Sequence, residues 1–407
     1  MSAMTAEHTP VILAAKRTPI GRFFGGLASV PSPQLGSYAI KAVLEEQPRI
    51  KDAVVEVVMG CVLQAGLGQN PARQAGLKAG LGGALSAQTV NKVCGSGLQA
   101  VMLAAQSIKA GDTPAGGVVI AGGFENMTQA PHFAHIRDSA GAPKFGAVSF
   151  EDHMQYDGLR CAFECWGMTN AAEHTAREFG ISRSDQDRFA AQSHQRAAAA
   201  TKQGWFKTEI APLSGEQVGN RKSPGPEGGV SADEGIRPET TVETLAKLKT
   251  VPGHETITAG NASQISDGAA AVAVASMATA EKLGIKPMAR IVAYHTSGVA
   301  PKELFTAPAL AIPAVLEKAK LAVKDIDLFE LNEAFAAQVL QNIRATGIPE
   351  EKLNVAGGGI ALGHPIGASG ARVLVTLLHQ LIRTGGKRGL AALCLGGGNA
   401  VAMVVER

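Results

Sequence analysis

The chain has 407 residues, more than one typical domain, so we expect at least two units with their own cores. Its composition, 45% hydrophobic, 18% charged and 4% aromatic with 48 glycines, is typical of an α/β protein with many tight turns and excludes a disordered or fibrous chain. With 38 basic and 35 acidic residues the net charge is only +3, which argues against nucleic-acid binding but leaves room for a local basic patch that binds a phosphorylated ligand.

Five cysteines, an odd number spread along the chain, fit free thiols in a reducing compartment better than a disulfide framework. They are Cys61, Cys94, Cys161, Cys165 and Cys394. The CxxxC spacing of Cys161 and Cys165 has no second Cys/His pair at zinc-ligand spacing, so we expect no metal site. No apolar run reaches the roughly 18 residues of a membrane span, and the N-terminus lacks a signal-peptide pattern. We therefore expect a cytoplasmic protein that binds no membrane.

The first half of the chain alternates short apolar runs with one long apolar helix. Val11–Leu13 predicts a first strand, and Val54–Met59 and Val118–Ala121 predict buried strands. Between the last two, residues 96–110 place apolar side chains on one helical face, and Gly111 is expected to end that helix.

The same order returns near the C-terminus. Asn354-Val355-Ala356 leads into glycines, residues 368–383 predict an apolar helix, and Leu390–Leu395 and Ala400–Val405 predict a closing strand pair. Strand, Gly-rich turn, buried helix and strand thus occur once in each half. This pattern predicts a duplicated α/β unit with reactive residues on equivalent turns.

The middle of the chain is different. It holds most of the His and aromatic residues, a long polar helix candidate at Asp185–Lys202 and a Gly/Pro-rich stretch at Ser223–Gly229. An excursion of this length inside an α/β scaffold is usually functional. We therefore divide the chain into an N-terminal α/β half (1–124), a ligand-covering loop domain (125–255), a return to the N-terminal half (256–280) and a C-terminal α/β half (281–407).

Cys94 directly precedes Gly-Ser-Gly and the long apolar helix, so its sulfur is expected at a helix N-terminus. Unpaired N–H groups and the helix dipole favour a thiolate at that place, which makes Cys94 a candidate nucleophile. The alternative is a small core residue, which is what most free cysteines are.

His364 lies between Gly363 and Pro365, in a segment whose glycines open space beside the ring. If it faces Cys94, its neutral imidazole can take the thiol proton and later polarise a carbonyl. The alternative is a histidine that is satisfied structurally.

Cys394 precedes a run of three glycines. By itself it is most like a buried strand cysteine, with the glycines serving a turn. A functional reading gains support because Gly396 would expose a backbone N–H near the sulfur, a plausible oxyanion donor.

Asn332 follows the strand-like run Ile326–Leu331 and precedes an apolar helix. An Asn at this point is normally an N-cap, and the competing interpretation is an amide aimed into the site. The small-residue stretch from Gly260 to Ala270 is either a plain tight turn or a surface on which a pantetheine-like arm could lie. No phosphate-loop or dinucleotide fingerprint is present.

Taken together, these segments resemble the thiolase family over essentially the whole chain. Several long motifs in fixed order make the resemblance specific; they are RTPIG from Arg17, NKVCGSGLQAV, GGFENMTQAP, AGNASQISDGAA, LNEAFAAQ, GGGIALGHPIGASGAR and CLGGGNA. The resemblance implies two mixed five-stranded sheets in αβαβα layers, an inserted loop domain over coenzyme A, and commonly a homotetramer.

The resemblance also implies roles for individual residues. Cys94 would be the acylated nucleophile, His364 its activator and Cys394 the acid/base at the substrate α-carbon. Asn332 would hold a water that forms one oxyanion site with His364, and the N–H groups of Cys94 and Gly396 would form the other. The residues expected to contact coenzyme A are Arg221, Ala259, Gly260, Ser263, Met168 and Phe335.

The implied function is acyl transfer between coenzyme A thioesters, without a prosthetic group or metal. It would condense two acetyl-CoA to acetoacetyl-CoA and coenzyme A, or run the reverse cleavage, through an acyl-Cys94 intermediate. Two thiols suit this chemistry, because one cysteine cannot be both blocked as a thioester and free as a base. The alternatives are a broader-chain 3-ketoacyl-CoA thiolase and a non-catalytic acyl-CoA-binding subunit.

One departure concerns acyl-chain preference. Acetyl-specific members of the family commonly carry His-Met-Gly in the acyl pocket, where this chain has Gly167-Met168-Thr169. The Cys94-Gly95-Ser96-Gly97 form nevertheless looks more like acetoacetyl-CoA-forming enzymes, which favours a short acyl chain.

Overall fold

The computed structural model of the protein describes residues 5–135, 145–219 and 225–407. Ten strands join into one mixed sheet that has two halves with matching strand order. The first half runs β1-β8-β5-β3-β4, with the short β2 beside β8, and the second half runs β9-β12-β11-β10. The strands are β1 (Pro10–Arg17), β2 (Gly21–Arg22), β3 (Val54–Gly60), β4 (Ser86–Val90), β5 (Val118–Asn126), β8 (Ser266–Ser276), β9 (Ala289–Gly298), β10 (Leu328–Leu331), β11 (Arg388–Leu395) and β12 (Asn399–Glu406).

The two halves have the same strand directions. β3 lies parallel to β5 and β4, while β8 runs antiparallel to β5 and β1. In the second half β10 lies parallel to β11, and β12 runs antiparallel to β11 and β9. The halves meet where β1 pairs antiparallel with β9 at two positions. The duplicated α/β fold predicted from the sequence is therefore confirmed.

The strand count differs from the prediction of two five-stranded sheets. Four strands make up the second half, and in the part of the chain that the structure describes its fifth position is held by an isolated parallel bridge between Phe329 and Leu353. The reason lies at Asn354, whose φ of 44° turns the chain out of the extended conformation directly after Leu353. A ladder cannot continue past such a residue.

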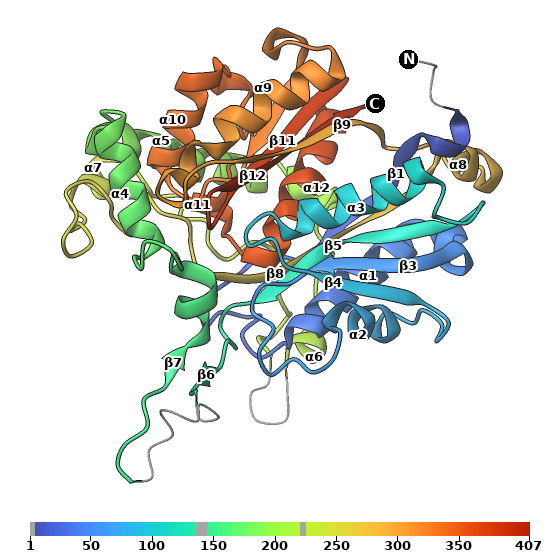
Figure 1. The fold of residues 1–407 in the computed structure, drawn as a ribbon, viewed down its shortest axis with the longest axis horizontal. Coiled ribbons are helices and arrows are strands. Elements are labelled where there is room, and N and C mark those ends of the chain that lie inside the picture. Colours follow the sequence, from blue (N-terminus) through green and yellow to red (C-terminus); the bar gives the residue numbers. More distant parts are fainter. Residues whose placement is uncertain (1–4, 136–144, 220–224) are drawn as a thin grey trace.

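The helices and sheet halves form layers (Figure 1). α1 (Ser32–Glu46) and α2 (Pro71–Lys78) cover the outer face of the first half, and α9 (Ala307–Ala319) packs against β9 and β12 of the second half, beside α10 (Ala336–Thr346). α3 (Ser96–Ala110) and α12 (Ile366–Thr384) pack against one another in the central layer.

The central helices match their predicted bounds closely. Helix α3 spans residues 96–110 as expected and ends at Gly111, whose φ of 82° suits a glycine C-cap. Every residue of α12 from Ile366 to Leu381 is buried. A helix buried along its length is mostly apolar, which explains the long apolar pattern at 368–383, although its buried residues also include Arg372 and His379.

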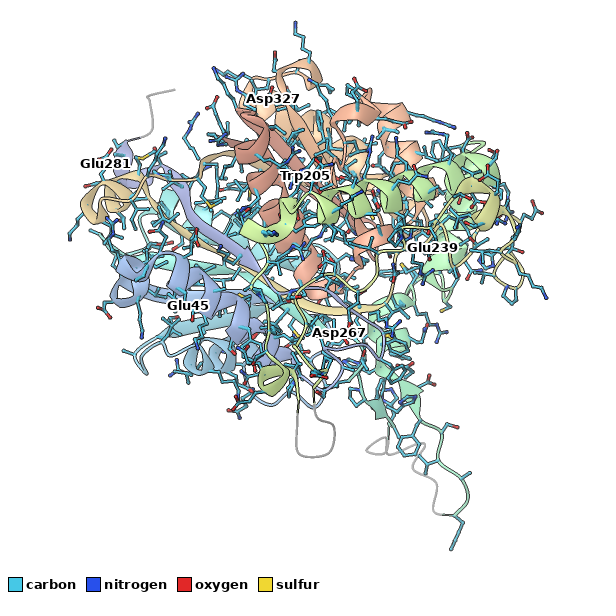
Figure 2. All side chains as sticks on the ribbon, turned by 180° about the vertical axis from the view of Figure 1, so that it is seen from behind. Glu45, Trp205, Glu239, Asp267, Glu281 and Asp327 are labelled. Atoms are coloured by element: carbon cyan, nitrogen blue, oxygen red, sulfur yellow. The ribbon has the colours of Figure 1, made fainter. Side chains whose placement is uncertain are left out.

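Between β5 and β8 the chain leaves the sheet and forms a largely helical insertion. It contains β6 (His132–Phe133), β7 (Glu151–Asp152), α4 (Met168–Glu178), α5 (Arg183–Lys202), α6 (Gly215–Val218) and α7 (Val242–Ala246). The polar helix predicted at 185–202 is α5, and seen from behind it runs across the molecule to Trp205 (Figure 2). The Arg383 guanidinium lies 3.6 Å from the centroid of the Trp205 ring and joins this segment to the end of α12.

After the insertion, β8 and the short helix α8 (Met277–Leu283) rejoin the first half and β9 begins the second. The division into four segments with ends at 124, 255 and 280 stays a prediction. Among the residues that the structure describes, no helix combines the length and apolar character needed to cross a bilayer.

Candidate active site

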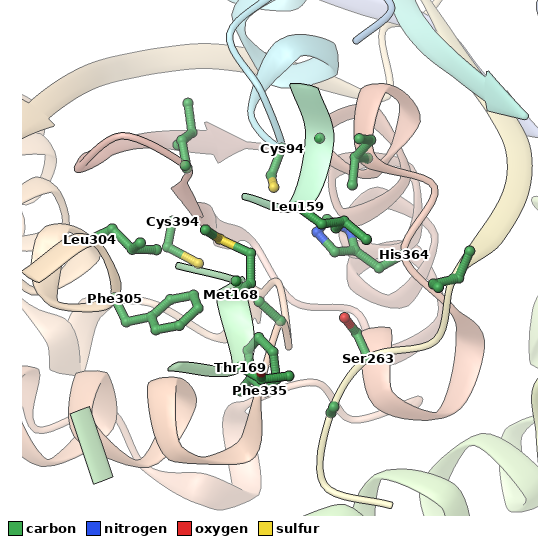
Figure 3. A pocket seen from close by; sticks show the side chains of 18 of the residues that line it. Cys94, Leu159, Met168, Thr169, Ser263, Leu304, Phe305, Phe335, His364 and Cys394 are labelled. Carbon is green, nitrogen blue, oxygen red and sulfur yellow. The ribbon is translucent and has the colours of Figure 1, made fainter. Parts of the chain in front are cut away.

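Both candidate thiols and the candidate histidine line one cavity of about 270 Å³. Figure 3 shows Cys94, Cys394 and His364 around this cavity, with Met168, Leu304 and Phe305 toward the Cys394 side and Ser263 away from it. Cys94 comes from the turn before α3, His364 from the turn before α12 and Cys394 from the end of β11. The expectation that equivalent turns of the two halves carry reactive residues is therefore met for Cys94 and His364.

Local hydrogen bonds hold the turn that presents Cys94. The Ser96 hydroxyl accepts the N–H of Lys92 at 2.8 Å and donates to the carbonyl of Val93 at 2.6 Å. Val93 has a φ of 47°, which is unusual for a β-branched residue and persists only where the surroundings enforce it. Cys94 is thereby fixed two residues before the first helical residue, half-buried at the cavity.

The environment of the Cys94 sulfur differs from the one expected. Burial raises the pKa of this thiol to about 11, and the nearby Glu125 carboxylate adds to the increase. The backbone N–H groups of Gly396 and of Cys94 itself lower the pKa but do not offset the burial. The expected thiolate at the helix N-terminus is not favoured, because loss of hydration outweighs the two N–H groups at the sulfur. Cys94 is a neutral thiol near pH 7 and needs a base.

His364 is oriented by a hydroxyl group. Its Nδ1 lies 2.6 Å from the Ser369 hydroxyl, which donates its proton to the carbonyl of Pro365 at 2.9 Å. Because that hydroxyl has a single proton, the network assigns the imidazole proton to Nδ1 and leaves Nε2 free to accept one. Burial, helped by the charge of Arg372, lowers the pKa of His364 to about 3, so the ring is neutral.

Asn332 does not cap a helix. β10 ends at Leu331, and α10 begins only at Ala336 with Phe335 as its N-cap. The Asn332 backbone N–H donates to the carbonyl of Ala392, and its side-chain amide nitrogen lies 3.3 Å from Nε2 of His364. Its Oδ1 is buried and has no hydrogen-bond partner among the described residues. The structure thus favours the amide aimed at the site over the N-cap.

Cys394 is the penultimate residue of β11, where it is opposite Ala400 in the ladder, and its sulfur is buried. Burial raises the pKa of this thiol well above its ordinary value, and the neighbouring Cys94 adds to the increase. Two residues on, Gly396 also lines the cavity, and a Cβ at this position would lie 3.1 Å from Cγ1 of Val93. The glycine therefore lets the backbone N–H of residue 396 approach the Cys94 turn closely.

Three of the six residues expected to contact coenzyme A line the cavity: Met168, Ser263 and Phe335. Two others lie outside it. Ala259 is exposed, and Gly260 is buried so closely against Leu245 that a Cβ there would lie 2.5 Å from its Cδ2. Arg221 is outside the described residues.

The sequence reading missed three groups that hold His364 and its helix in place. They are Ser369, the carbonyl of Gln264, which accepts the His364 N–H at 3.1 Å, and Glu125. Glu125 accepts N–H groups of Val62, Leu63 and Gly367, and burial raises its pKa to about 7. A glutamate shortly after the apolar run Val118–Ala121, in the segment Gly122-Gly123-Phe124-Glu125, was a signal that could have found it.

Cys161 is buried and Cys165 exposed, and both are free thiols. Among the residues described, no group of three or more His, Cys, Asp and Glu side chains could hold a metal ion.

A neutral thiol beside a neutral imidazole, a second thiol in the same cavity and paired N–H groups at the first sulfur define a cysteine-dependent acyl-transfer site. Comparison with known proteins identifies its family. Residues 10–278 match the thiolase N-terminal domain, and residues 285–407 match the thiolase C-terminal domain. The chain belongs to the thiolase family.

Similar proteins have nearly the same length as this chain. An acetyl-CoA acetyltransferase of Chromobacterium violaceum is 50% identical over 97% of this chain and 99% of its own. An acetyl-CoA acetyltransferase of Pseudomonas aeruginosa is 48% identical over 98% and 99%. A probable acetyl-CoA acyltransferase of Staphylococcus aureus is 47% identical over 98% of both chains.

Proposed function

We propose that the protein is an acetyl-CoA C-acetyltransferase, which condenses two acetyl-CoA to acetoacetyl-CoA and coenzyme A or catalyses the reverse thiolysis. The observation that carries the proposal is the shared cavity of Cys94, His364 and Cys394. The names of the full-length relatives support thiolase activity and do not favour a broader-chain enzyme or a subunit without turnover.

In the thiolysis direction, Cys94 is the nucleophile. Nε2 of His364 takes the thiol proton as the sulfur attacks the C3 carbonyl of acetoacetyl-CoA. The oxygen of the tetrahedral intermediate accepts hydrogen bonds from the N–H groups of Cys94 and Gly396. Both N–H groups already lower the pKa of the Cys94 sulfur, so both lie next to the atom to which the oxyanion carbon becomes bonded.

Cys394 is the acid/base at the α-carbon. When the C2–C3 bond breaks, its electron pair moves onto the leaving acetyl-CoA as an enolate, which takes a proton from the Cys394 thiol. His364 and Asn332, together with a water held by Asn332, stabilise the enolate oxygen; the unpartnered Oδ1 of Asn332 supports a water at this place. The Cys394 thiolate then takes the thiol proton of coenzyme A, whose sulfur attacks the carbonyl of acetyl-Cys94. The C–S bond to Cys94 breaks, the second acetyl-CoA leaves, and the Cys94 sulfur takes its proton back from His364.

Coenzyme A thioesters are the substrates, and no prosthetic group takes part. Met168, Ser263 and Phe335 contact the acyl and pantetheine parts inside the cavity. Ala259, four residues before Ser263, contacts the coenzyme where it leaves the cavity, and Arg221 binds its phosphates. Gly260, three residues before Ser263, is buried against Leu245 and lets this segment pass close to the insertion.

The assembly is a homotetramer in the cytoplasm. This part of the proposal rests on the family resemblance and on the cysteine content. Light scattering during size-exclusion chromatography tests it, and a mass below four chains would contradict it.

Three measurements on purified protein test the activity. Wild type is expected to cleave acetoacetyl-CoA in the presence of coenzyme A and, with acetyl-CoA alone, to gain one acetyl group on the peptide that contains Cys94. Cys94→Ser should lose cleavage while still binding coenzyme A, whereas Cys165→Ser, which changes an exposed thiol, should keep full activity. Acetylation at another residue, or cleavage by Cys94→Ser at the wild-type rate, would overturn the proposal.

A further inference from the structure

A buried charged pair lies one helical turn beyond the hydroxyl that orients His364. Arg372 of α12 and Glu330 of β10 are each only 1% exposed, and Nη1 of the guanidinium lies 3.6 Å from Oε2 of the carboxyl. Arg372 follows Ser369 by three residues on the helix, so the two side chains share a helical face. Glu330 precedes Asn332 by two residues along the extended segment, so these two also share a face. The pair thus lies beside the row formed by Ser369, His364 and Asn332.

Stability does not account for the pair between Arg372 and Glu330. A distance of 3.6 Å is too long for a hydrogen bond. Among the residues that the structure describes, the three guanidinium nitrogens and both carboxyl oxygens have no hydrogen-bond partner. Charged groups buried in this way destabilise a fold, and apolar side chains of similar size would pack α12 against β10 at least as well. A role in the reaction explains better why an arginine stands here.

The positive charge of Arg372 is not cancelled by Glu330. Burial raises the pKa of Glu330 to about 8 against the opposing effect of Arg372, so the carboxyl is mostly protonated near pH 7. Burial also lowers the pKa of Arg372, but a guanidinium keeps its proton in a protein. The two other carboxylates that affect Glu330 have partners of their own. Glu209 is paired with Arg17, and Glu333 accepts hydrogen bonds from a hydroxyl, an amide and a backbone N–H.

This charge acts on one side of the cavity. Burial lowers the pKa of His364, and Arg372 adds to this effect. Burial raises the pKa of Cys94 and of Cys394, with no contribution from Arg372. When the Cys394 thiolate removes a proton from the methyl group of acetyl-CoA, the C–H electron pair becomes the enolate, and one negative charge moves from the sulfur to the enolate oxygen beside Asn332. That movement brings the charge toward Arg372, and a fixed positive charge in a buried site stabilises it there.

We propose that Arg372 is a positioning residue of the enolate site, which supports the negative charge of the enolate through His364 and Asn332 without touching the substrate. This inference rests on the proposed function. It assigns the effect of Arg372 to proton transfer at the α-carbon and not to acetyl transfer. Acetyl transfer to and from the first thiol places its negative charge at the N–H groups of Cys94 and Gly396.

Two partial reactions of the same enzyme separate these steps. Exchange of isotopically labelled coenzyme A into acetyl-CoA needs only acetylation and deacetylation of Cys94, whereas incorporation of deuterium from heavy water into the methyl group of acetyl-CoA needs the enolate. Arg372→Met should lower deuterium incorporation roughly tenfold or more relative to coenzyme A exchange. Arg372→Lys retains the charge and should recover part of the loss. Arg383→Met is the matched control, because it removes an arginine of the same helix whose guanidinium faces Trp205, and it should keep the wild-type ratio.

A double variant keeps the test decisive if Arg372→Met does not fold. Arg372→Met combined with Glu330→Gln replaces both members of the pair by neutral side chains of similar size, and it should show the same selective loss. Equal losses in the two partial reactions, or a selective loss in Arg383→Met as large as in Arg372→Met, overturn the inference. Wild type that carries out both partial reactions while Arg372→Met keeps their ratio refutes the inference alone. Wild type that carries out neither refutes the proposed function itself.

Discussion

Gly97 of α3 and Gly370 of α12 lie where the two central helices cross, backbone against backbone. A Cβ on Gly97 would stand 2.7 Å from the backbone nitrogen of Ala371, and one on Gly370 would collide with the backbone nitrogen of Leu98. This close crossing brings together the first turns of two helices from different halves of the chain. Those turns follow Cys94 and His364, so the pair of glycines sets the separation of nucleophile and base.

Replacing Gly370 by Ala should therefore lower both stability and activity. The added methyl group meets backbone that cannot rotate away, and overpacking of this kind costs about 1–3 kcal/mol or more. Urea unfolding measures the loss, and the rate of acetoacetyl-CoA cleavage should fall with it. Gly82→Ala is the control, because a Cβ there has no neighbour within 4 Å. Equal stability of the two variants would contradict the claim that the helices α3 and α12 cross too closely at Gly370 to admit a methyl group.

Removing the Ser369 hydroxyl should lower kcat with little change in KM. Ser369 holds Nδ1 of His364 at 2.6 Å and so fixes the tautomer with a free Nε2. Losing such a supporting group typically reduces activity roughly tenfold to a hundredfold. Ser369→Thr retains the hydroxyl and should recover part of the rate, which a purely structural role would not predict. Ser37→Ala, at a buried serine that bonds to the carbonyl of Gln34, should leave kcat unchanged.

The sequence was sufficient for elements whose signals are local. The apolar face of residues 96–110 and the glycine after it predicted α3, because helix period and C-cap chemistry depend on neighbouring residues alone. The residues around Cys94, His364 and Cys394 were found because each reactive group lies beside glycines in a long motif.

The features that the sequence did not predict depend on contacts between segments far apart in the chain. From the residues alone Asn332 looked like an N-cap, because helix α10 starts three residues later than the apolar pattern suggested. The Cys94 pKa was misjudged because the helix N-terminus is visible in the sequence, whereas the burial of the sulfur comes from packing against other segments. The fifth strand of the second half is missing because Asn354 adopts the left-handed conformation. Asn tolerates this conformation but does not require it, so the sequence does not predict it.

Alkylation of Cys94 should accelerate with pH and reach no plateau below pH 10. With a pKa of about 11, the thiolate is roughly one part in ten thousand at pH 7 and increases about tenfold per pH unit. Because the pKa of His364 is about 3, no inflection from the imidazole is expected between pH 5 and 8. Inactivation rates with iodoacetamide in a Cys165→Ser background measure this, and acetyl-CoA should protect. A plateau near pH 7 would mean that Cys94 rests as a thiolate.

Neutralising Asp233, the buried partner of Arg17, should destabilise the protein far more than neutralising Glu350, the more exposed partner of Arg188. Asp233 accepts two hydrogen bonds from the guanidinium of Arg17, at 2.7 and 2.9 Å, with both side chains fully buried. Asp233→Asn leaves the Arg17 charge with Glu209 alone in a site without water, which should cost about 3–5 kcal/mol. Glu350→Gln, which breaks the exposed pair with Arg188, should cost less than about 1 kcal/mol.

The ion pair between Arg17 and Asp233 joins β1 to the insertion, so its loss should also weaken the binding of coenzyme A. Arg17 ends β1, whereas Glu209 and Asp233 belong to the segment between β5 and β8. If the insertion docks less firmly in Asp233→Asn, the KM for coenzyme A should rise more than kcat falls, because the thiols and His364 stand on the two sheet halves and their central helices. Unfolding in urea and thiolysis kinetics on one preparation separate the two effects. A stability loss no larger than that of Glu350→Gln would show that the buried charges contribute little to holding the insertion in place.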